Sequence, residues 1–360
     1  MQRAGRAGEE VSAAGEVGTV VELPAVRGAA PVALGIMAVA FAYSMGAHYT
    51  GACMGMPHAL GAVSARRALW LMAPLALLGA AFASHAVEHT VGFTLTMLPL
   101  GAGAEIVVLA VAFGLTIAFT QLRVPTSTIQ ILVLSLAGVA LGTGDGVRWA
   151  RIGLLAIVWV AAPVTAAALG FVLTRALGAL APARRGETGR ERGTEVGAQG
   201  GIFLAVGLVA VGMAASFTMG ANDVANATGS LVGTGTLNAL AAGTLGGAGL
   251  AVGALTWGRP LLQQVAFEIV ELDRAMATAA QLVQAAVVAV AVGFGLFTSL
   301  NQALVGAMAG AGAARGRHTV RVETLKGIVR GWVIGPGAGI ALGYVIARVV
   351  TAISAHALTG

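Results

Sequence analysis

The sequence predicts an all-α polytopic membrane protein, with about 10–12 transmembrane or re-entrant helices in two inverted repeats. Three observations lead to this fold class: an apolar composition, a succession of apolar segments and an internal repeat. Of the 360 residues, 57% are hydrophobic and 53 are glycine, whereas only 10% are charged, against about 25% in a soluble protein. The mean hydropathy is +0.86. Such a chain cannot cover a water-facing surface with polar groups, which excludes a soluble enzyme, a disordered protein and a disulfide scaffold.

The net charge of +6 does not indicate nucleic-acid binding. The basic residues, 20 arginines and one lysine, fall in short gaps between apolar runs, where membrane proteins carry their topology signals. No basic stretch is interleaved with aromatic residues, so no nucleic-acid partner is expected. The single cysteine, Cys53, cannot form an internal disulfide.

Composition divides the chain into a polar N-terminal tail, a first membrane repeat, a cytoplasmic linker, a second membrane repeat and a C-terminal tail. Their predicted bounds are 1–29, 30–175, 176–200, 201–350 and 351–360. The apolar segments lie at about 30–47, 68–84, 102–120, 127–142, 150–175, 201–219, 238–256, 279–298, 300–314 and 330–350. Several are shorter than the roughly 20 residues that span a bilayer, which favours broken or re-entrant helices.

The distribution of basic residues predicts the orientation. Alternate sides of the predicted segments carry fifteen and six Lys and Arg residues. Since cytoplasmic loops carry the excess of Lys and Arg, the richer side, which includes the 176–200 linker, should be cytoplasmic and both termini should lie outside.

Two pairs of segments reveal an internal repeat. WVAAPVTAAALGFVLTR at 159–175 matches WVIGPGAGIALGYVIAR at 332–348 without gaps, at an offset of 173. SMGA at 44–47 matches TMGA at 218–221 at an offset of 174. The nearly constant offset indicates that the two halves of the chain are duplicates.

A third match, Gln130 with Gln302 at an offset of 172, extends the repeat. Because each half has an odd number of segments, five, the second half should be inverted relative to the first. Inverted repeats are typical of secondary transporters, whose substrate site lies at the repeat interface near the membrane midplane.

The strongest local motif is MGANDVANATG at 219–229, which places Asn222, Asp223 and Asn226 in an apolar region. A charge at membrane depth costs roughly 3 kcal/mol on insertion scales, so Asp223 is a candidate functional residue. Asn222 and Asn226 share a helix face, and the glycines at both ends would allow the helix to break. The alternative is a polar contact between helices.

The counterpart in the first half is MGAHYTGACMG at 45–55. Here His48 stands in the place of Asn222 and Tyr49 in the place of Asp223, so this copy of the motif has lost its carboxylate. The imidazole of His48 could carry a proton or donate to an anion, because it titrates near neutral pH. The alternative is a packed, hydrogen-bonded histidine.

Two short motifs, PTSTIQ at 125–130 and FTSLNQ at 297–302, begin glycine-rich apolar segments at the repeat offset. Their polar residues would lie at helix starts, where free N–H groups and the positive end of the helix dipole suit an oxyanion. Ordinary N-capping by serine and threonine explains the same residues.

The sequence resembles the inorganic phosphate transporter family, the phosphate permeases with a duplicated GANDVANA signature. Residues 222–227 reproduce that signature within GANDVANATG. The family's second signature, Pro-x-Ser-Thr-Thr-His, is matched in part by Pro125, Ser127 and Thr128 in the first half and by Ser299 in the second.

The resemblance implies cation-driven import of inorganic phosphate, in which the paired signatures form the anion and cation sites. We expect substrate binding by Ser127, Thr128, Ser299, Asn301, Asn222 and Asn226, and cation coupling by Asp223 and His48. The expected partners are phosphate or sulfate, a co-transported proton or sodium ion, the lipid bilayer and a possible second copy in a homodimer. No cofactor or resident metal is expected, and the expected location is a bacterial plasma membrane.

The incomplete signatures leave two other functions open. One is a sulfate permease of the same family, because a carboxylate acceptor favours protonated phosphate over sulfate and one of the two family carboxylates is absent. The other is a non-transporting accessory protein that retains the fold. The sequence contains no nucleophile–base pair, P-loop or dinucleotide fingerprint, so an enzyme is not expected.

Overall fold

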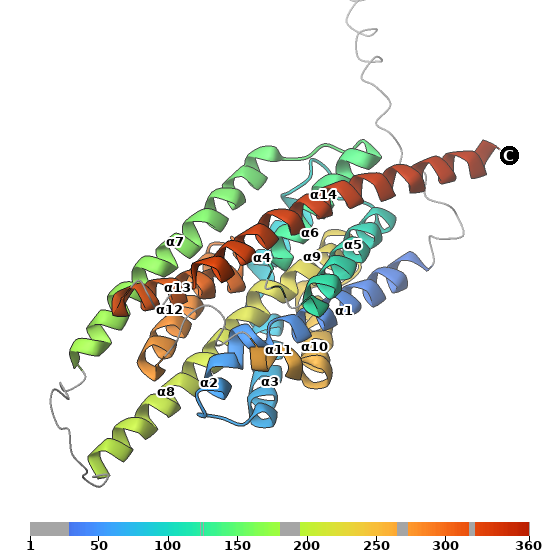
Figure 1. The fold of residues 1–360 in the computed structure, drawn as a ribbon. Coiled ribbons are helices and arrows are strands. Elements are labelled where there is room, and N and C mark those ends of the chain that lie inside the picture. The colour runs from blue at the N-terminus through green and yellow to red at the C-terminus, as the bar shows by residue number, and fades with distance from the viewer. Residues whose placement is uncertain are drawn as a thin grey trace, which may run out of the picture.

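The computed structural model describes residues 29–122, 124, 126–180, 195–264, 273–316 and 321–359. Apart from turns and an isolated bridge between Thr96 and Val147, the described part is helical, which confirms the predicted all-α class (Figure 1). The predicted N-terminal tail of 1–29 lies outside the described residues except for its last residue.

The first half consists of seven α-helices and one π-helical turn, η1. In chain order these are α1 (Ala30–His48), η1 (Gly51–Gly55), α2 (Met56–Ala59), α3 (Ala65–Ala83), α4 (His85–Phe93), α5 (Ala102–Gln121), α6 (Thr128–Thr143) and α7 (Trp149–Leu180).

The second half has the same kinds of element, with a second π-helical turn, η2. Its described elements are α8 (Glu195–Met219), η2 (Gly220–Val224), α9 (Ala225–Gly233), α10 (Ala239–Trp257), α11 (Arg259–Gln264), α12 (Arg274–Gly293), α13 (Leu300–Arg315) and α14 (Val322–Thr359).

Eight helical stretches among the described residues are long and apolar enough to cross a membrane, and α6 is a shorter apolar helix. The chain is therefore a multi-pass membrane protein. Two of the eight stretches, Ala30–Ala59 and Ile202–Gly233, contain the π-helical turns. The short helices α6 and α13 begin inside the structure, where their first residues, Thr128 and Leu300, are buried.

Several segments begin or end at residues other than those predicted from the sequence. The segment expected at 279–298 ends at Gly293, because Gly295 adopts a φ of 65° that a helix cannot continue through. The expected C-terminal tail, 351–360, is helical to Thr359 as the end of α14. Helices α7 and α8 reach into the expected linker from both sides, and 181–194 lies outside the described residues.

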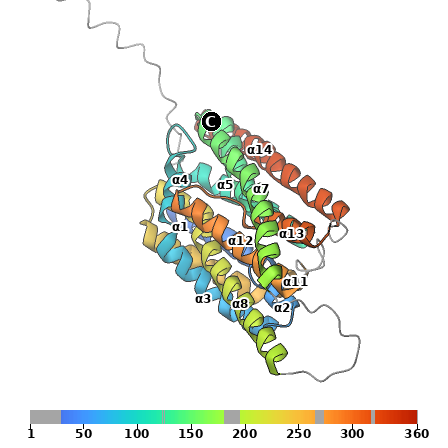
Figure 2. The same ribbon diagram turned by 90° about the vertical axis from the view of Figure 1, so that its left-hand side faces the viewer.

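The long helices α7 and α14 extend across the upper part of the molecule in Figure 1, and Figure 2 shows them with α12 and α13 from the side. Helix α6 packs along α14, and α13 packs along α7. Likewise α1 packs on α10 and α3 on α8. Each of these pairs joins one helix of the first half to one of the second.

Close glycine contacts at these crossings repeat between the halves. The backbone at Gly46 contacts the carbonyl of Leu250, and the backbone at Gly220 contacts the carbonyl of Ala76. Gly46 and Gly220 are 174 positions apart, and so are Ala76 and Leu250, so the repeat offset relates the two contacts to each other. Small residues allow membrane helices to approach this closely. The matching contacts support a two-fold relation between the halves.

We expect Gly220→Ala to destabilise the protein by about 1–3 kcal/mol or more, the usual cost of overpacking. A Cβ there would collide with the backbone carbonyl of Ala76, which cannot rotate away. The matched control is Gly35→Ala, because a Cβ at Gly35 would have nothing within 4 Å. Thermal unfolding in detergent should show a lower midpoint for the first variant alone. Equal midpoints would contradict the close approach.

Candidate functional site

The two signature motifs form π-helical turns rather than helix breaks. The chain stays helical through η2, whereas a single turn residue, Tyr49, lies between α1 and the helical residues that lead into η1, and every residue of both π-helical turns is buried. The prediction that Gly220 breaks the helix is therefore corrected: the turn widens, but both flanking residues keep right-handed helical angles. π-helical turns often occur at functional sites, because they redirect side chains without ending the helix.

In the second half, Asn222 ties η2 to the loop before α13. Its Nδ2 donates to the carbonyl oxygen of Thr298 at 2.8 Å, and its Oδ1 accepts from the N–H of Thr298 at 3.3 Å. The same Nδ2 lies 3.1 Å from Oδ2 of Asp223. One asparagine thus positions both the carboxylate and the loop that carries Ser299 and Asn301.

Buried side-chain oxygens without a hydrogen-bond donor surround this point. They are Oδ1 of Asp223, Oδ1 of Asn226, Oγ1 of Thr298 and Oε1 of Gln284, and the amide nitrogen Nδ2 of Asn226 has no partner either. Gln284 lies on α12, and its Nε2 donates to the carbonyl of Leu300 at 3.3 Å, which places it beside the Thr298 loop. Unpaired acceptors in a buried site are costly unless a donor or a cation occupies them.

In the first half, both ring nitrogens of His48 have buried polar partners. Its Nδ1 is 2.8 Å from the hydroxyl of Thr120, and that hydroxyl donates to the carbonyl of Thr116 at 2.7 Å. Nδ1 therefore donates to Thr120. Nε2 lies 3.3 Å from Nδ2 of Asn301, from which a neutral ring accepts, and 3.4 Å from the carbonyl of Thr126, to which a protonated ring would donate.

The side chain of Asn301, in the second half, contacts residues of the first half. Besides its contact with His48, its Nδ2 donates to the carbonyl of Thr126 at 2.9 Å. Thr126 belongs to the other short motif, PTSTIQ, and precedes its Ser127. The amide of Asn301 therefore connects the starts of α6 and α13.

Tyr49, which replaces the carboxylate in the first half, is fully buried. Its hydroxyl lies 2.8 Å from Oγ1 of Thr128, at the start of α6. The side chain also interacts with the carboxylate of Asp223. The phenol thus lies between the predicted anion element of one half and the carboxylate of the other.

The two serines cap the short helices, as the simpler interpretation predicts. Oγ of Ser127 accepts from the N–H of Gln130, and Oγ of Ser299 accepts from the N–H of Gln302, both at 3.3 Å. The two glutamine amides also bond each other reciprocally, at 3.2 and 3.1 Å. Helices α6 and α13 therefore begin next to each other.

All eight predicted site residues belong to one buried region, with exposures between 0% and 4%. Reasoning from the sequence missed the contribution of Tyr49, Gln281 and Gln284. The signal that could have found the glutamines is their position as polar residues in an otherwise apolar helix, the same argument that singled out Asp223.

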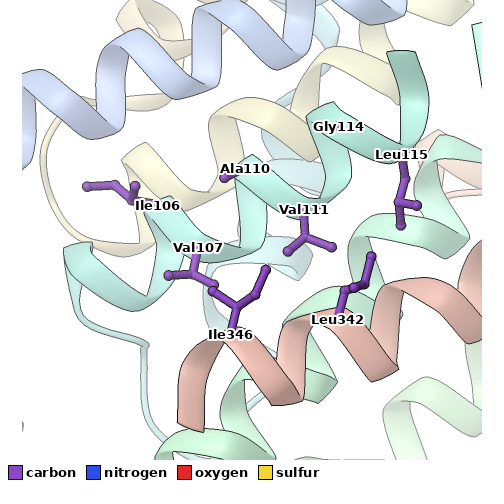
Figure 3. Close-up of a pocket in the computed structure, with 8 residues that line it drawn as sticks. All are labelled: Ile106, Val107, Ala110, Val111, Gly114, Leu115, Leu342 and Ile346. Carbon is purple, nitrogen blue, oxygen red and sulfur yellow. The ribbon is translucent and has the colours of Figure 1, made fainter. Parts of the chain in front are cut away.

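A groove of about 350 Å³ between α5 and α14 lies apart from this region. Figure 3 shows its walls, which are apolar side chains such as Val107, Val111, Leu342 and Ile346. An anion would lose its hydration there without gaining a donor, so the groove is not the anion site.

Among the described residues, no group of three or more His, Cys, Asp or Glu side chains could hold a metal ion. The cluster around Asp223 has one carboxylate and several neutral oxygens. Such a donor set suits a hard cation that binds weakly and reversibly rather than a resident transition metal.

The membrane-spanning helices bury a polar cluster in which the turns η1 and η2 meet the starts of α6 and α13. This arrangement is that of a membrane transport protein. The chain belongs to the phosphate transporter family, whose sequence pattern matches residues 45–343. The family is one of transporters, and the resemblance noted from the signature motifs is confirmed.

Two relatives and a solved structure illustrate what the chain is similar to. A chloroplastic inorganic phosphate transporter of Arabidopsis thaliana is 34% identical over 156 residues, or 40% of this chain and 27% of that protein. A sulfate permease of Bacillus subtilis is 26% identical over 322 residues, or 85% of this chain and 84% of that protein. A solved sodium-dependent phosphate transporter superposes with a TM-score of 0.79 over 90% of this chain and 100% of its own, at 22% identity, which shows a common fold.

Proposed function

We propose that this protein is a secondary active transporter that imports inorganic phosphate, together with a cation, across the plasma membrane. The observation that carries the proposal is the buried cluster around Asp223, in which four acceptor oxygens have no donor. A cation bound there would satisfy these oxygens and neutralise the carboxylate, beside the helix starts where an oxyanion can bind.

The anion elements are the starts of α6 and α13. Free N–H groups and the positive dipole end at a helix start favour an oxyanion. Hydroxyl and amide groups of Ser127, Thr128, Ser299 and Asn301 lie at these two starts, with Asn222 and Asn226 on the adjoining turn and helix. A bound anion would have to exchange some of the present contacts for its own, because the serines now cap their helices.

Phosphate is the first candidate anion, because the chain belongs to the phosphate transporter family. Phosphate near neutral pH carries a proton, so it can donate a hydrogen bond to Asp223. Sulfate is the second candidate, supported by the Bacillus subtilis sulfate permease, which aligns over most of both chains, and by the missing first-half carboxylate.

The cation is sodium in our proposal. The free oxygens of Asp223, Asn226, Thr298 and Gln284 are hard, mostly neutral ligands, and the protein of similar fold is named as sodium-dependent. A proton on His48 is the second candidate. It would convert Nε2 from an acceptor to a donor, which exchanges its contact with the amide of Asn301 for one with the carbonyl of Thr126.

The test is uptake of radiolabelled phosphate by proteoliposomes containing the purified protein. A sodium gradient at equal pH should drive accumulation, whereas a pH gradient at equal sodium should not. Excess unlabelled sulfate should compete weakly. Equal competition by sulfate would make sulfate the substrate, uptake driven by pH alone would favour His48, and no uptake in either gradient would contradict transport.

We further propose that the two halves are inverted in the membrane, with the linker in the cytoplasm. A cysteine introduced as Thr188→Cys should then resist an impermeant maleimide in intact cells and react after permeabilisation. Asp145→Cys, in the loop between α6 and α7, should react from outside and serves as the matched control. The native Cys53 is buried and gives little background. Ready labelling at position 188 in intact cells would reverse the orientation.

A further inference from the structure

The starting observation is the difference between the two halves of the site. In the second half, the oxygens without a donor around Asp223 belong to Asp223, Asn226, Thr298 and Gln284, and Oε1 of Gln281 on α12 is also without one. The repeat offsets give the position that corresponds to each of them in the first half. Two equivalent halves would offer two equivalent cation sites.

Three of the four counterpart positions carry no free oxygen. At the offset of 174, Asp223 corresponds to Tyr49 and Asn226 to Ala52. Any offset from 172 to 174 relates Gln284 to a residue of 110–112, where the chain has alanine, valine and alanine.

The fourth counterpart keeps its oxygen. At the offset of 172, Thr298 corresponds to Thr126, whose Oγ1 has no hydrogen-bond partner. One hydroxyl cannot replace the six or so oxygens that a hard cation collects.

Most polar groups on the first-half side already have hydrogen-bond partners. The Nε2 of Gln281, on α12, donates to the carbonyl of Ala52 at 3.0 Å and also to that of Cys53. The hydroxyl of Tyr49 is satisfied by Thr128 at 2.8 Å. These groups are already paired, and Oε1 of Gln281 is left as a free acceptor beside them, whereas four free acceptors belong to the residues around Asp223 in the second half.

Tyr49 also changes the charge balance. A carboxylate at this position would put a second negative charge near Asp223, and that charge would need its own cation, because an unpaired charge at membrane depth is costly. The phenol is neutral and fully buried, with its ring edge-on to His48 at 5.2 Å between centroids. The Tyr49 side chain occupies the volume of a second cation site but adds no negative charge that a second cation would have to neutralise.

We infer that this transporter binds a single coupling cation for each anion, and that Tyr49 is the residue that closes the second cation site. The inference rests on the proposed function and specifies its stoichiometry. Tyr49 acts here by occupying the site and determining the number of ions, and the cation itself is held by the second half.

The stoichiometry is measured as the phosphate gradient at which net flux stops in proteoliposomes with the membrane potential clamped at zero. For a tenfold sodium gradient, one cation per anion balances a phosphate gradient of about tenfold, and two cations balance about a hundredfold. We expect about tenfold for the wild type. A value near a hundredfold would overturn the inference while leaving cation-coupled transport intact.

The double variant Tyr49→Asp/Ala52→Asn restores the acceptor side chains that the second half carries at these positions. Its balancing gradient should rise toward a hundredfold, whereas Tyr49→Phe, which adds no oxygen, should stay near tenfold. A folded double variant that stays near tenfold would show that Tyr49 does not close the site. The wild-type value decides the stoichiometry even if the double variant does not fold. Absence of phosphate flux in wild-type vesicles would instead contradict the proposed function itself.

Discussion

Asp223→Asn is expected to abolish sodium-driven accumulation of phosphate, so that the internal concentration never exceeds the external one. The substitution keeps the size of the side chain and its hydrogen bond to Asn222, but removes the only charge among the four free acceptors. Without that charge, a bare cation entering the buried site is not neutralised, and the free-energy cost of removing its water is not offset. Accumulation is measured as radiolabelled phosphate retained at steady state.

The control for this variant is Asp145→Asn, which removes an aspartate outside the buried cluster, in the turn after α6. It should accumulate phosphate like the wild type. Thermal unfolding in detergent separates a coupling defect from a folding defect, because Asp223→Asn should unfold at a similar or higher temperature once the buried charge is gone. Normal accumulation by a folded Asp223→Asn protein would remove Asp223 from cation coupling.

The second large effect is expected for Asn222→Leu. Asn222 makes both hydrogen bonds that hold the backbone of Thr298. Leucine would leave a buried N–H and a buried carbonyl without partners, at about 1–3 kcal/mol for each unpaired group. If the loop then shifts in the absence of substrate, the dissociation constant for phosphate should rise by about 10- to 100-fold. Binding is measured with radiolabelled phosphate on the purified protein.

A matched variant tests the structural reason. His48 occupies the position of Asn222 in the first half, and its Nε2 lies 3.4 Å from the carbonyl of Thr126, as Asn222 lies beside Thr298. Asn222→His retains a side chain that can donate to this carbonyl, so it should recover part of the lost affinity. If Leu and His variants bind equally poorly, the hydrogen bond to Thr298 is not the cause.

The sequence predicted the main features of this site because polar residues are so rare in it. In a chain with 10% charged residues, an Asp-Asn cluster within an apolar run can hardly be placed on a surface. The repeat offset then associated that cluster with the Ser299 motif and with the first-half elements. The structure places all of these in one buried region.

Contacts between distant elements could not be predicted in the same way. The sequence does not show that Gln281 and Gln284 of α12 approach the carbonyls of Ala52 and Leu300. These contacts depend on the angle at which α12 packs. The tautomer of His48 likewise depends on Thr120, which is 72 positions away. Local pattern indicates which residues are candidates, and tertiary packing determines their partners.

Turn chemistry explains the remaining differences. The sequence suggested a break at Gly220, but glycine only permits a break, and continued packing against Ala76 keeps the chain helical there. At Gly295, by contrast, the positive φ does end the helical run, and the loop that follows carries Thr298 to Asn222. The same residue type has opposite outcomes because its neighbours differ.

The most direct test of cation coupling at Asp223 is phosphate binding by the purified protein in sodium and in choline salts of equal ionic strength. If the cation and the anion bind side by side and stabilise each other, each must raise the affinity of the other by the same factor. We expect sodium to lower the phosphate dissociation constant by about tenfold or more in the wild type, and to have no effect in Asp223→Asn. Equal affinity of the wild-type protein in the two salts would contradict the account.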